Sequence, residues 1–432
     1  MLIIPFSTAV AAQKSDDITW QRGTGEAPAA APTAQMPQAP AVQYDPSEGQ
    51  VPAALQRWKM LSAPGNFSFG EYAAFLMRYP DWPNSDEMRK NAEQAINPLS
   101  LSPSQVVAFF DRLPPLTNAG RARFAIALHA SGDTSRAEEQ ARAAWRGGSL
   151  NDDDEARMFR IAGNRFTSAD HDARVDRLLW SGSTRGAERW IAYTSPQRRP
   201  AFIAALATRL KAADADQKVQ DAGALANSEA TLIAARADSM RSTGNSIGAR
   251  ELLANRANLA APVPVLKDWY QLLLTHAQAA ANDGQYDVAY RIASRVDDAT
   301  PRGLVMIDQD ITTRDRYTSL TWLAGMTAME RLGRPSDAVA MFERYASAAK
   351  SAQTRSKGLH FAGKAAAKAG DQAAATRYHE QSAAYYESFF GQLSLEQLRR
   401  PLPPVPRIAP AAPVLAEGDV PAVYLAAALA PK

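Results

Sequence analysis

The sequence predicts an all-α protein, a superhelical solenoid of helical hairpins similar to tetratricopeptide arrays. Three observations lead to this prediction. Alanine dominates the apolar residues and β-branched runs are scarce, a composition that favours closely packed helices. From Pro52 to Leu398, apolar residues recur at helical spacing with almost no alternation of the strand type. A glycine–alanine motif also recurs between these segments. Whether the solenoid is curved or closes into a ring stays open.

Four regions are expected along the 432 residues. Residues 1–13, MLIIPFSTAVAAQ, are interpreted as a shortened secretory signal, because a short apolar run precedes Ala-Val-Ala, and this indicates a periplasmic protein. Residues 14–51 carry spaced prolines that predict a flexible leader. Residues 52–398 form the predicted α-superhelical domain. Residues 399–432 are a proline-rich tail, expected to be disordered apart from a short apolar helix near 423–429.

The hairpins are predicted from a glycine that alanine follows five positions later. The glycine is expected to take the left-handed conformation that ends one helix, and the alanine lets the next helix pack closely. The spacings of 50, 62, 40, 49 and 37 residues between these glycines are too irregular for a strict repeat of about 34 residues. Further helices are expected from Gly70 and near Arg121. The motif occurs at Gly132/Ala137, Gly182/Ala187, Gly244/Ala249, Gly284/Ala289, Gly333/Ala338 and Gly370/Ala375.

Three other segments are interpreted as structural. The tryptophan of YPDWP, Trp82, is expected to fill a hairpin junction, with sugar stacking as the alternative. The acidic run NDDDEAR, residues 151–157, suits the positive end of a following helix better than a cation site. The segment GLVMID, residues 303–308, resembles a strand but is too isolated to build a sheet.

Composition excludes several functions. The chain has no cysteine, so it has no disulfide, thiolate catalysis or cysteine-based metal site. Its 48 basic and 45 acidic residues are interspersed, with a net charge of +3, which argues against nucleic-acid binding. No stretch has the roughly 20 apolar residues of a transmembrane helix, so no integral membrane segment is expected.

No catalytic, cofactor-binding or metal-binding residue is predicted. The histidines are too far apart for a metal site, and His171, between Asp170 and Asp172, is interpreted as a residue of the surface or of a helix start. Nucleophile-elbow, phosphate-loop and dinucleotide motifs are missing from the sequence. We therefore expect no cofactor.

The stretch YYESFFGQLSLEQL, residues 385–398, contains the acid that most resembles a catalytic one, Glu387. On a continuous helix at about 100° per residue, Glu387 lies about 200° from Tyr385 and faces solvent. An exposed carboxyl is not desolvated as a general acid would be. The same geometry predicts one buried face made of Tyr385, Tyr386, Phe389, Phe390 and Leu393.

Five segments, in order along the chain, resemble the superhelical, ring-forming domain of soluble lytic murein transglycosylases. The last, GKAAAKAGDQAAATRYHEQSAAYYESFFGQL, is the most specific. The resemblance implies that fold and a periplasmic location. It covers most of residues 52–398 through SFGEYAAFLMRYPDWP (68–83), DHDARVDRLLWSGSTRGAERW (170–190), GQYDVAYRIAS (284–294), LTWLAGMTAMERLGRPSDAVAMFERY (320–345) and the last segment (363–393).

The family cleaves the glycan strand of peptidoglycan between MurNAc and GlcNAc, forming 1,6-anhydromuramyl ends. Its catalytic glutamate, in a Glu-Ser motif, belongs to a C-terminal lysozyme-like domain for which the residues after Leu398 leave no room. The resemblance thus implies a periplasmic scaffold, inactive alone, whose partners are peptidoglycan glycan strands or cell-wall enzymes. A general protein-interaction solenoid and a truncated or frameshifted form of an active transglycosylase are the alternatives.

Overall fold

A computed structural model describes residues 50–98 and 100–404. These residues form twenty α-helices and five short 3-10 helices, and they contain no strand, which confirms the all-α prediction. The first ten helices are α1 (Gln50–Ser62), α2 (Phe69–Arg78), α3 (Ser85–Ala95), α4 (Pro103–Arg112), α5 (Asn118–Ala130), α6 (Thr134–Arg146), α7 (Asp152–Ala162), α8 (Ser168–Trp180), α9 (Thr184–Trp190) and α10 (Arg199–Leu210).

The other ten are α11 (Ala215–Asp221), α12 (Ala230–Ser242), α13 (Ser246–Ala254), α14 (Leu266–Asn282), α15 (Tyr286–Ala293), α16 (Ile311–Glu330), α17 (Pro335–Ser347), α18 (Ala352–Lys368), α19 (Gln372–Ala383) and α20 (Phe389–Gln397). The 3-10 helices are η2 (Gly163–Arg165), η3 (Ile191–Tyr193), η4 (Gly223–Asn227), η5 (Val296–Ala299) and η6 (Met306–Asp308).

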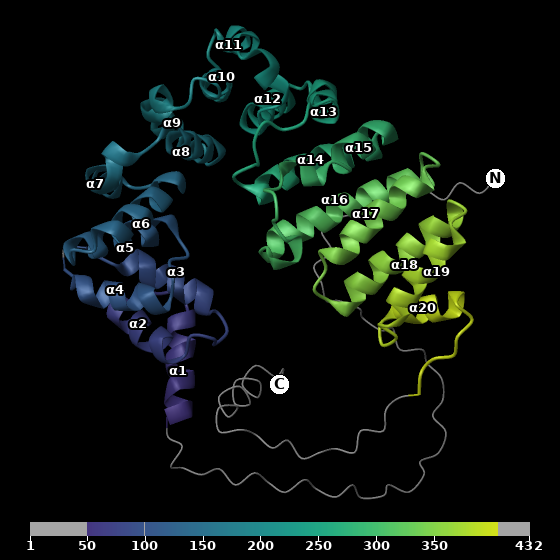
Figure 1. Ribbon diagram of the computed structural model, residues 1–432, viewed down its shortest axis with the longest axis horizontal. Helices are drawn as coiled ribbons and strands as arrows, with labels where there is room; N and C mark the ends of the chain where they lie inside the picture. The colour runs from purple at the N-terminus through teal and green to yellow at the C-terminus, as the bar shows by residue number, and fades with distance from the viewer. Residues whose placement is uncertain (1–49, 99, 405–432) are drawn as a thin grey trace, which may run out of the picture. The chain divides into compact units, whose positions relative to one another are not determined.

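Consecutive helices pack against each other as hairpins. α16, α17, α18 and α19 lie side by side in chain order (Figure 1), and α5 packs on α6 in the same way. Further contacts join helices two places apart, such as α14 with α16 and α18 with α20. This sequential packing is that of a helical solenoid. Some contacts reach further along the chain, such as that of α8 with α12.

The glycine–alanine motif marks a helix junction at every predicted position. All six glycines have a positive φ, between 62° and 88°, as expected for the left-handed conformation at the end of a helix. All six alanines are buried in the next helix. At Gly284, for example, the next amide, of Gln285, reaches back to the carbonyl oxygen of Ala280 at 2.8 Å. These turns are therefore confirmed, and their irregular spacing reflects junctions of other kinds between them.

The core consists largely of alanines and aromatic rings where neighbouring helices meet. The largest cluster joins α12 to α17 around Trp269, Tyr270 and Tyr317, all of which are buried. Trp180 and Leu272 are half-buried and pack on the edge of this cluster. The cluster therefore holds α12 and α14 in place beside the end of α8. None of the helices in the described residues is both long and apolar enough to span a bilayer.

The prediction of one continuous helix through Glu387 is wrong. α19 ends at Ala383, and α20 begins at Phe389 after a turn. Ser388 caps α20 by accepting a hydrogen bond from the Gly391 amide at 3.2 Å. This break changes the side-chain directions, so Phe389 is 59% exposed instead of buried. Glu387 is exposed, as expected.

All three segments interpreted as structural lie within the described residues, and two of them are part of the helix junctions. Trp82 lies between α2 and α3, with its ring centroid 5.5 Å from that of Phe75 and 5.1 Å from that of Tyr79, so it fills a hairpin junction. The segment 303–308 ends in η6 and forms no strand. The predicted signal, and most of the predicted leader and tail, lie outside the described residues.

Candidate functional site

The acidic run at residues 151–157 begins a helix, as predicted, and also supplies buried ion pairs. Asn151 caps α7, whose first turn holds four acidic residues. Glu155 pairs with the guanidinium of Arg174, which has no solvent exposure. Arg174 also donates to the carbonyl oxygen of Gly148 at 2.6 Å and lies 4.0 Å over the Trp145 ring. The run therefore has a structural role. In the described part of the chain, no group of three or more His, Cys, Asp or Glu side chains is placed to hold a metal ion.

His171 lies at the start of α8, as one part of its interpretation expected, but the other part, a surface position, is wrong. The residue is 6% exposed. Its imidazole stacks on the rings of Tyr193 and Trp190, at centroid distances of 5.4 and 5.8 Å. Burial lowers the pKa of His171 despite the nearby carboxylate of Asp170. The histidine therefore fills the junction between α8 and η3 in the neutral form.

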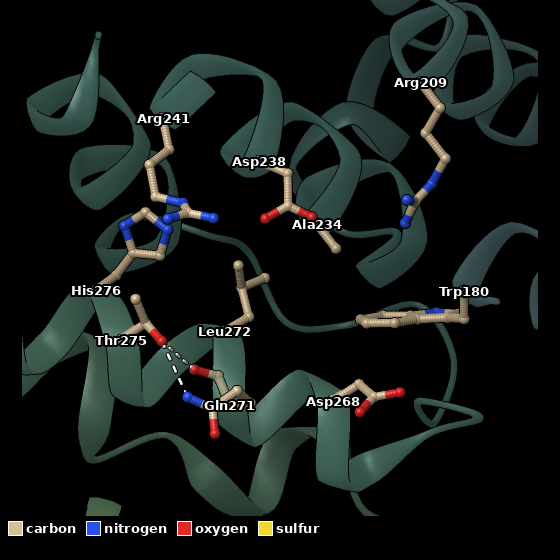
Figure 2. A pocket seen from close by; sticks show the side chains of 10 residues that line it. All are labelled: Trp180, Arg209, Ala234, Asp238, Arg241, Asp268, Gln271, Leu272, Thr275 and His276. Carbon is tan, nitrogen blue, oxygen red and sulfur yellow. Dashed lines mark hydrogen bonds between the residues drawn. The ribbon is translucent and has the colours of Figure 1, made fainter. Parts of the chain in front are cut away.

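A polar pocket of about 240 Å³ lies where α8, α10, α12 and α14 meet (Figure 2). We call it the α12–α14 pocket. It lies beside the contact of α8 with α12, two helices that are four places apart in the chain. The lining residues are Trp180 from α8, Arg209 from α10, Ala234, Asp238 and Arg241 from α12, and Asp268, Gln271, Leu272, Thr275 and His276 from α14.

Trp180 forms one wall of the pocket, and a series of hydrogen bonds fixes the orientation of its ring. Its indole N–H donates to the Thr231 hydroxyl at 2.8 Å, and that hydroxyl donates to Asp176. Arg198 donates to the other carboxylate oxygen of Asp176 at 3.0 Å and pairs with Glu229. Burial raises the pKa of Asp176 to about 6, and Arg198 opposes that shift. This chain of contacts positions the tryptophan ring at the pocket.

The pocket also carries two arginines, Arg209 and Arg241, that make no side-chain hydrogen bond or ion pair in the described part of the chain. In Figure 2, Asp238 lies between Arg241 and Arg209. Within the described residues, neither guanidinium makes a hydrogen bond or an ion pair, and the Nε of Arg209 is buried. Burial lowers the pKa of Arg209, and Asp238 opposes this. Desolvation raises the pKa of the Asp238 carboxyl, and both arginines oppose that shift. A buried donor without an acceptor costs about 1–3 kcal/mol, so a ligand acceptor at this position would be stabilising.

His276 is buried at the edge of the same pocket. It is 2% exposed, and its Nε2 has no hydrogen-bond partner among the described residues. Burial, with the positive charges of Arg241 and Arg250, lowers its pKa to about 4. The imidazole is therefore neutral at pH 7 and can offer one hydrogen-bonding nitrogen without adding charge.

The α14 side of the pocket provides further hydrogen-bonding groups. Gln271 donates from its amide to the Thr275 hydroxyl at 3.1 Å. Asp268 lies 3.6 Å from a guanidinium nitrogen of Arg316, which balances its charge. Together with Trp180, these side chains surround the space with an aromatic ring, amide and hydroxyl groups and charges of both signs. Such a set can bind a small polar ligand and orient it.

A second hollow, more open, lies at the turn between α2 and α3. It has a volume of about 540 Å³ and is bordered by Trp82 and by the acidic side chains of Asp81, Asp86 and Glu87. The ring of Trp82 packs against the rings of Phe75 and Tyr79, and the carboxylate of Glu87 lies 3.1 Å from the amine of Lys90. These contacts explain the residues as structural, so we prefer the α12–α14 pocket as the site.

None of the pocket residues was predicted as functional from the sequence. They come from four helices, and no short motif contains them. Trp180 lies inside a segment used for the family resemblance, but nothing in that segment distinguishes it from a core tryptophan. Compared with known proteins, the chain matches no protein-family model and no curated protein sequence.

Proposed function

We propose that residues 52–398 act as a non-catalytic scaffold in the periplasm that binds peptidoglycan glycan strands at the α12–α14 pocket. The resemblance to the helical domain of soluble lytic murein transglycosylases suggests the polymer and the compartment. The single observation that carries the binding role is the pocket itself, where the ring of Trp180 shares the lining with polar atoms that have no hydrogen-bond partner among the described residues.

A glycan fits this combination for a chemical reason. A sugar ring has an apolar face of C–H groups that can pack on an aromatic ring, while its hydroxyl and acetamido groups need hydrogen-bond donors and acceptors. Trp180 supplies the aromatic surface. Asp238, Gln271 and Thr275 supply acceptors and donors around it. The solenoid then serves to hold these groups from separate helices at fixed positions.

Retention on purified peptidoglycan sacculi tests the proposal. The full chain is expected to sediment with sacculi, and W180A is expected to weaken retention by about tenfold, which corresponds to the loss of one stacked ring. Y193A is the matched control, because Tyr193 is an aromatic residue, 57% exposed, that does not line the pocket. Equal retention of W180A and wild type would contradict binding at this pocket.

The same incubation tests the absence of catalysis. Sacculi incubated with the chain are expected to release no 1,6-anhydromuramyl products when the soluble fraction is analysed by mass spectrometry. Release of such products would support the alternative of an active transglycosylase. Fractionation of bacteria that express the chain tests the proposed location, since the protein should appear with periplasmic markers.

The alternative of a general protein-interaction solenoid is favoured by a different observation. Two aliphatic side chains near the start of α16 are strongly exposed, Val305 at 53% and Ile311 at 66%. Exposed apolar residues are typical of protein contacts when they form a patch. If wild-type protein does not sediment with sacculi, and V305S/I311S abolishes capture of a protein partner that wild type retains, this alternative is preferred.

A further inference from the structure

We infer that the α12–α14 pocket binds a carboxylate group through Arg209 and Arg241. The inference stands on the charges and contacts of the pocket, and it concerns the chemistry of the ligand. It deepens the proposed function where the carboxylate belongs to an acidic sugar.

The charges in the pocket leave one positive charge unbalanced. Asp268 is balanced by Arg316, at 3.6 Å. His276 is buried and neutral at pH 7. The remaining groups are Arg209, Arg241 and Asp238, two cations and one anion. A ligand with a single negative charge completes this set, whereas a phosphate monoester, with a charge of about −1.5 to −2, would leave an excess of negative charge beside Asp238.

Within the described residues, Arg209 lacks the hydrogen bonds and ion pairs that the more deeply buried arginines make. Other largely buried arginines are paired: Arg174 with Glu155, Arg198 with Asp176 and Glu229, and Arg256 with Asp298. Arg209 is half-buried, its Nε is closed to solvent, and within the described residues it has neither a hydrogen bond nor an ion pair. A guanidinium in this position is suited to a ligand acceptor, because its planar N–H groups match the two oxygens of a carboxylate.

The arrangement also indicates how the rest of the ligand lies. Arg209 and Arg241 come from α10 and α12, on one side of the pocket, and Gln271 comes from α14 on the other (Figure 2). Asp238 already lies between the two arginines, so a ligand carboxylate would reach their guanidinium groups from the side of Leu272 and Trp180, with the body of the ligand over these two side chains. The volume of about 240 Å³ corresponds to about eight water molecules in the liquid, enough for a small organic acid. Asp238 can then accept a hydrogen bond from a hydroxyl or amide N–H of that ligand.

An acidic sugar and a peptide terminus share this chemistry, so the test uses probes that separate them. N-acetylmuramic acid carries a carboxylate on a sugar ring, N-acetylglucosamine has the ring without the carboxylate, and alanyl-alanine has a carboxylate without the ring. Binding of each to the full chain is measured by calorimetry at low salt. We expect N-acetylmuramic acid to bind at least about tenfold more tightly than N-acetylglucosamine, as a charge-assisted contact would require.

Variants of Arg209 and Arg241 show whether these two side chains bind the carboxylate. R209Q and R241Q are each expected to weaken binding of N-acetylmuramic acid by about tenfold or more. R160Q is the matched control, an exposed arginine of α7 away from the pocket, and should bind as wild type does. Circular dichroism at the assay temperature checks that each variant is folded. A variant that is unfolded is replaced by the lysine variant at the same position, which keeps the positive charge but lacks the planar guanidinium. The lysine variant should weaken binding less than a variant that loses the charge.

The outcomes separate this inference from the proposed function. Binding of alanyl-alanine but of neither sugar, with loss in both arginine variants, supports carboxylate recognition and contradicts the glycan function. Equal affinity for the two sugars, no binding of any probe, or unchanged affinity in either folded arginine variant would overturn the inference.

Discussion

The indole N–H of Trp180 donates to the hydroxyl of Thr231 at 2.8 Å, across 51 residues of sequence. The Thr231 hydroxyl in turn donates a hydrogen bond to the carboxylate of Asp176, which is buried. This connection joins α8 to α12 over three intervening helices. It therefore links the stability of the α8–α12 junction to the orientation of the aromatic wall of the pocket.

Removing the Thr231 hydroxyl should destabilise this junction. T231V keeps the side-chain shape but leaves the Trp180 indole and Asp176 without a hydrogen-bond partner, so we expect a loss of about 1–3 kcal/mol in the free energy of unfolding. Urea titration followed by tryptophan fluorescence measures it. T243V is the control, because Thr243 is exposed at the end of α12, and its effect should stay within about 0.5 kcal/mol. Equal effects of the two variants would contradict the role of Thr231.

Arg174 should be among the most sensitive positions. R174M removes one partner of a buried ion pair and leaves Glu155 with the half-exposed Arg189, at 3.1 Å, and the indole N–H of Trp190, at 3.2 Å, so we expect a loss of about 3–5 kcal/mol. Thermal unfolding monitored by circular dichroism provides the comparison. R165Q is the control, because it removes an ion pair with Glu138 in which the arginine side chain is largely exposed. Its expected cost in the free energy of unfolding is below about 1 kcal/mol. Similar melting temperatures for R174M and wild type would show that the buried pair contributes little.

Two glycines should respond in opposite ways to alanine. At Gly391, an added Cβ would overlap the backbone carbonyl oxygen of Tyr385, so G391A should displace α20 and cost more than about 2 kcal/mol. At Gly70, in the first turn of α2, an added Cβ meets nothing within 4 Å, and G70A should be neutral or stabilise by up to about 1 kcal/mol. Denaturant midpoints of the two variants test this contrast, which fails if G391A is tolerated as well as G70A.

Acid should destabilise the protein partly through His276. The pKa of His276 in the folded protein, about 4, lies below the ordinary histidine pKa of 6.5, so the folded state disfavours the protonated form. The contribution of neutral His276 to the free energy of unfolding is complete above pH 6.5 and is lost as the pH falls towards 4. This contribution is about 2 kcal/mol after a discount for solvent screening. Asp176 has the opposite sign, because its raised pKa of about 6 makes stability fall as pH rises from 3.8 to 6.

The difference between wild type and H276Q isolates the histidine, since the contribution of Asp176 is common to both proteins. We expect the stability advantage of wild type over H276Q to shrink as the pH falls from 6.5 to 4. Chemical denaturation at several pH values within that window measures it. Parallel stability curves for the two proteins would mean that His276 does not take part in the acid response.

The hairpin junctions could be predicted from the sequence because their cause is local. A left-handed glycine such as Gly284 and a small residue such as Ala289 lie five positions apart in the sequence, so the conformation of the junction does not depend on a distant contact. The error at residues 385–393 has a local cause as well. Ser388 three positions before Gly391 is a helix-start signal, and it ends the helical continuity that the angular argument assumed.

The pocket could not be predicted because its residues meet only through packing. Trp180, Arg209, Asp238 and His276 belong to four helices, and which faces meet depends on how each junction turns. The burial of His171 has the same origin, since the rings of Trp190 and Tyr193 that cover it come from the next helix, α9, and from η3. A sequence pattern shows which face of a helix is apolar, and it does not show which partner covers a polar residue.

Packing between near neighbours also has a consequence for how the chain opens. Each helix is stabilised chiefly by the helices beside it in the chain, so the loss of one junction need not propagate to the rest. Native-state hydrogen exchange should accordingly divide the amides into successive groups along the chain, each with its own opening free energy. The contact of α8 with α12 spans α9 to α11, and it should make those segments exchange as one cooperative unit around the pocket.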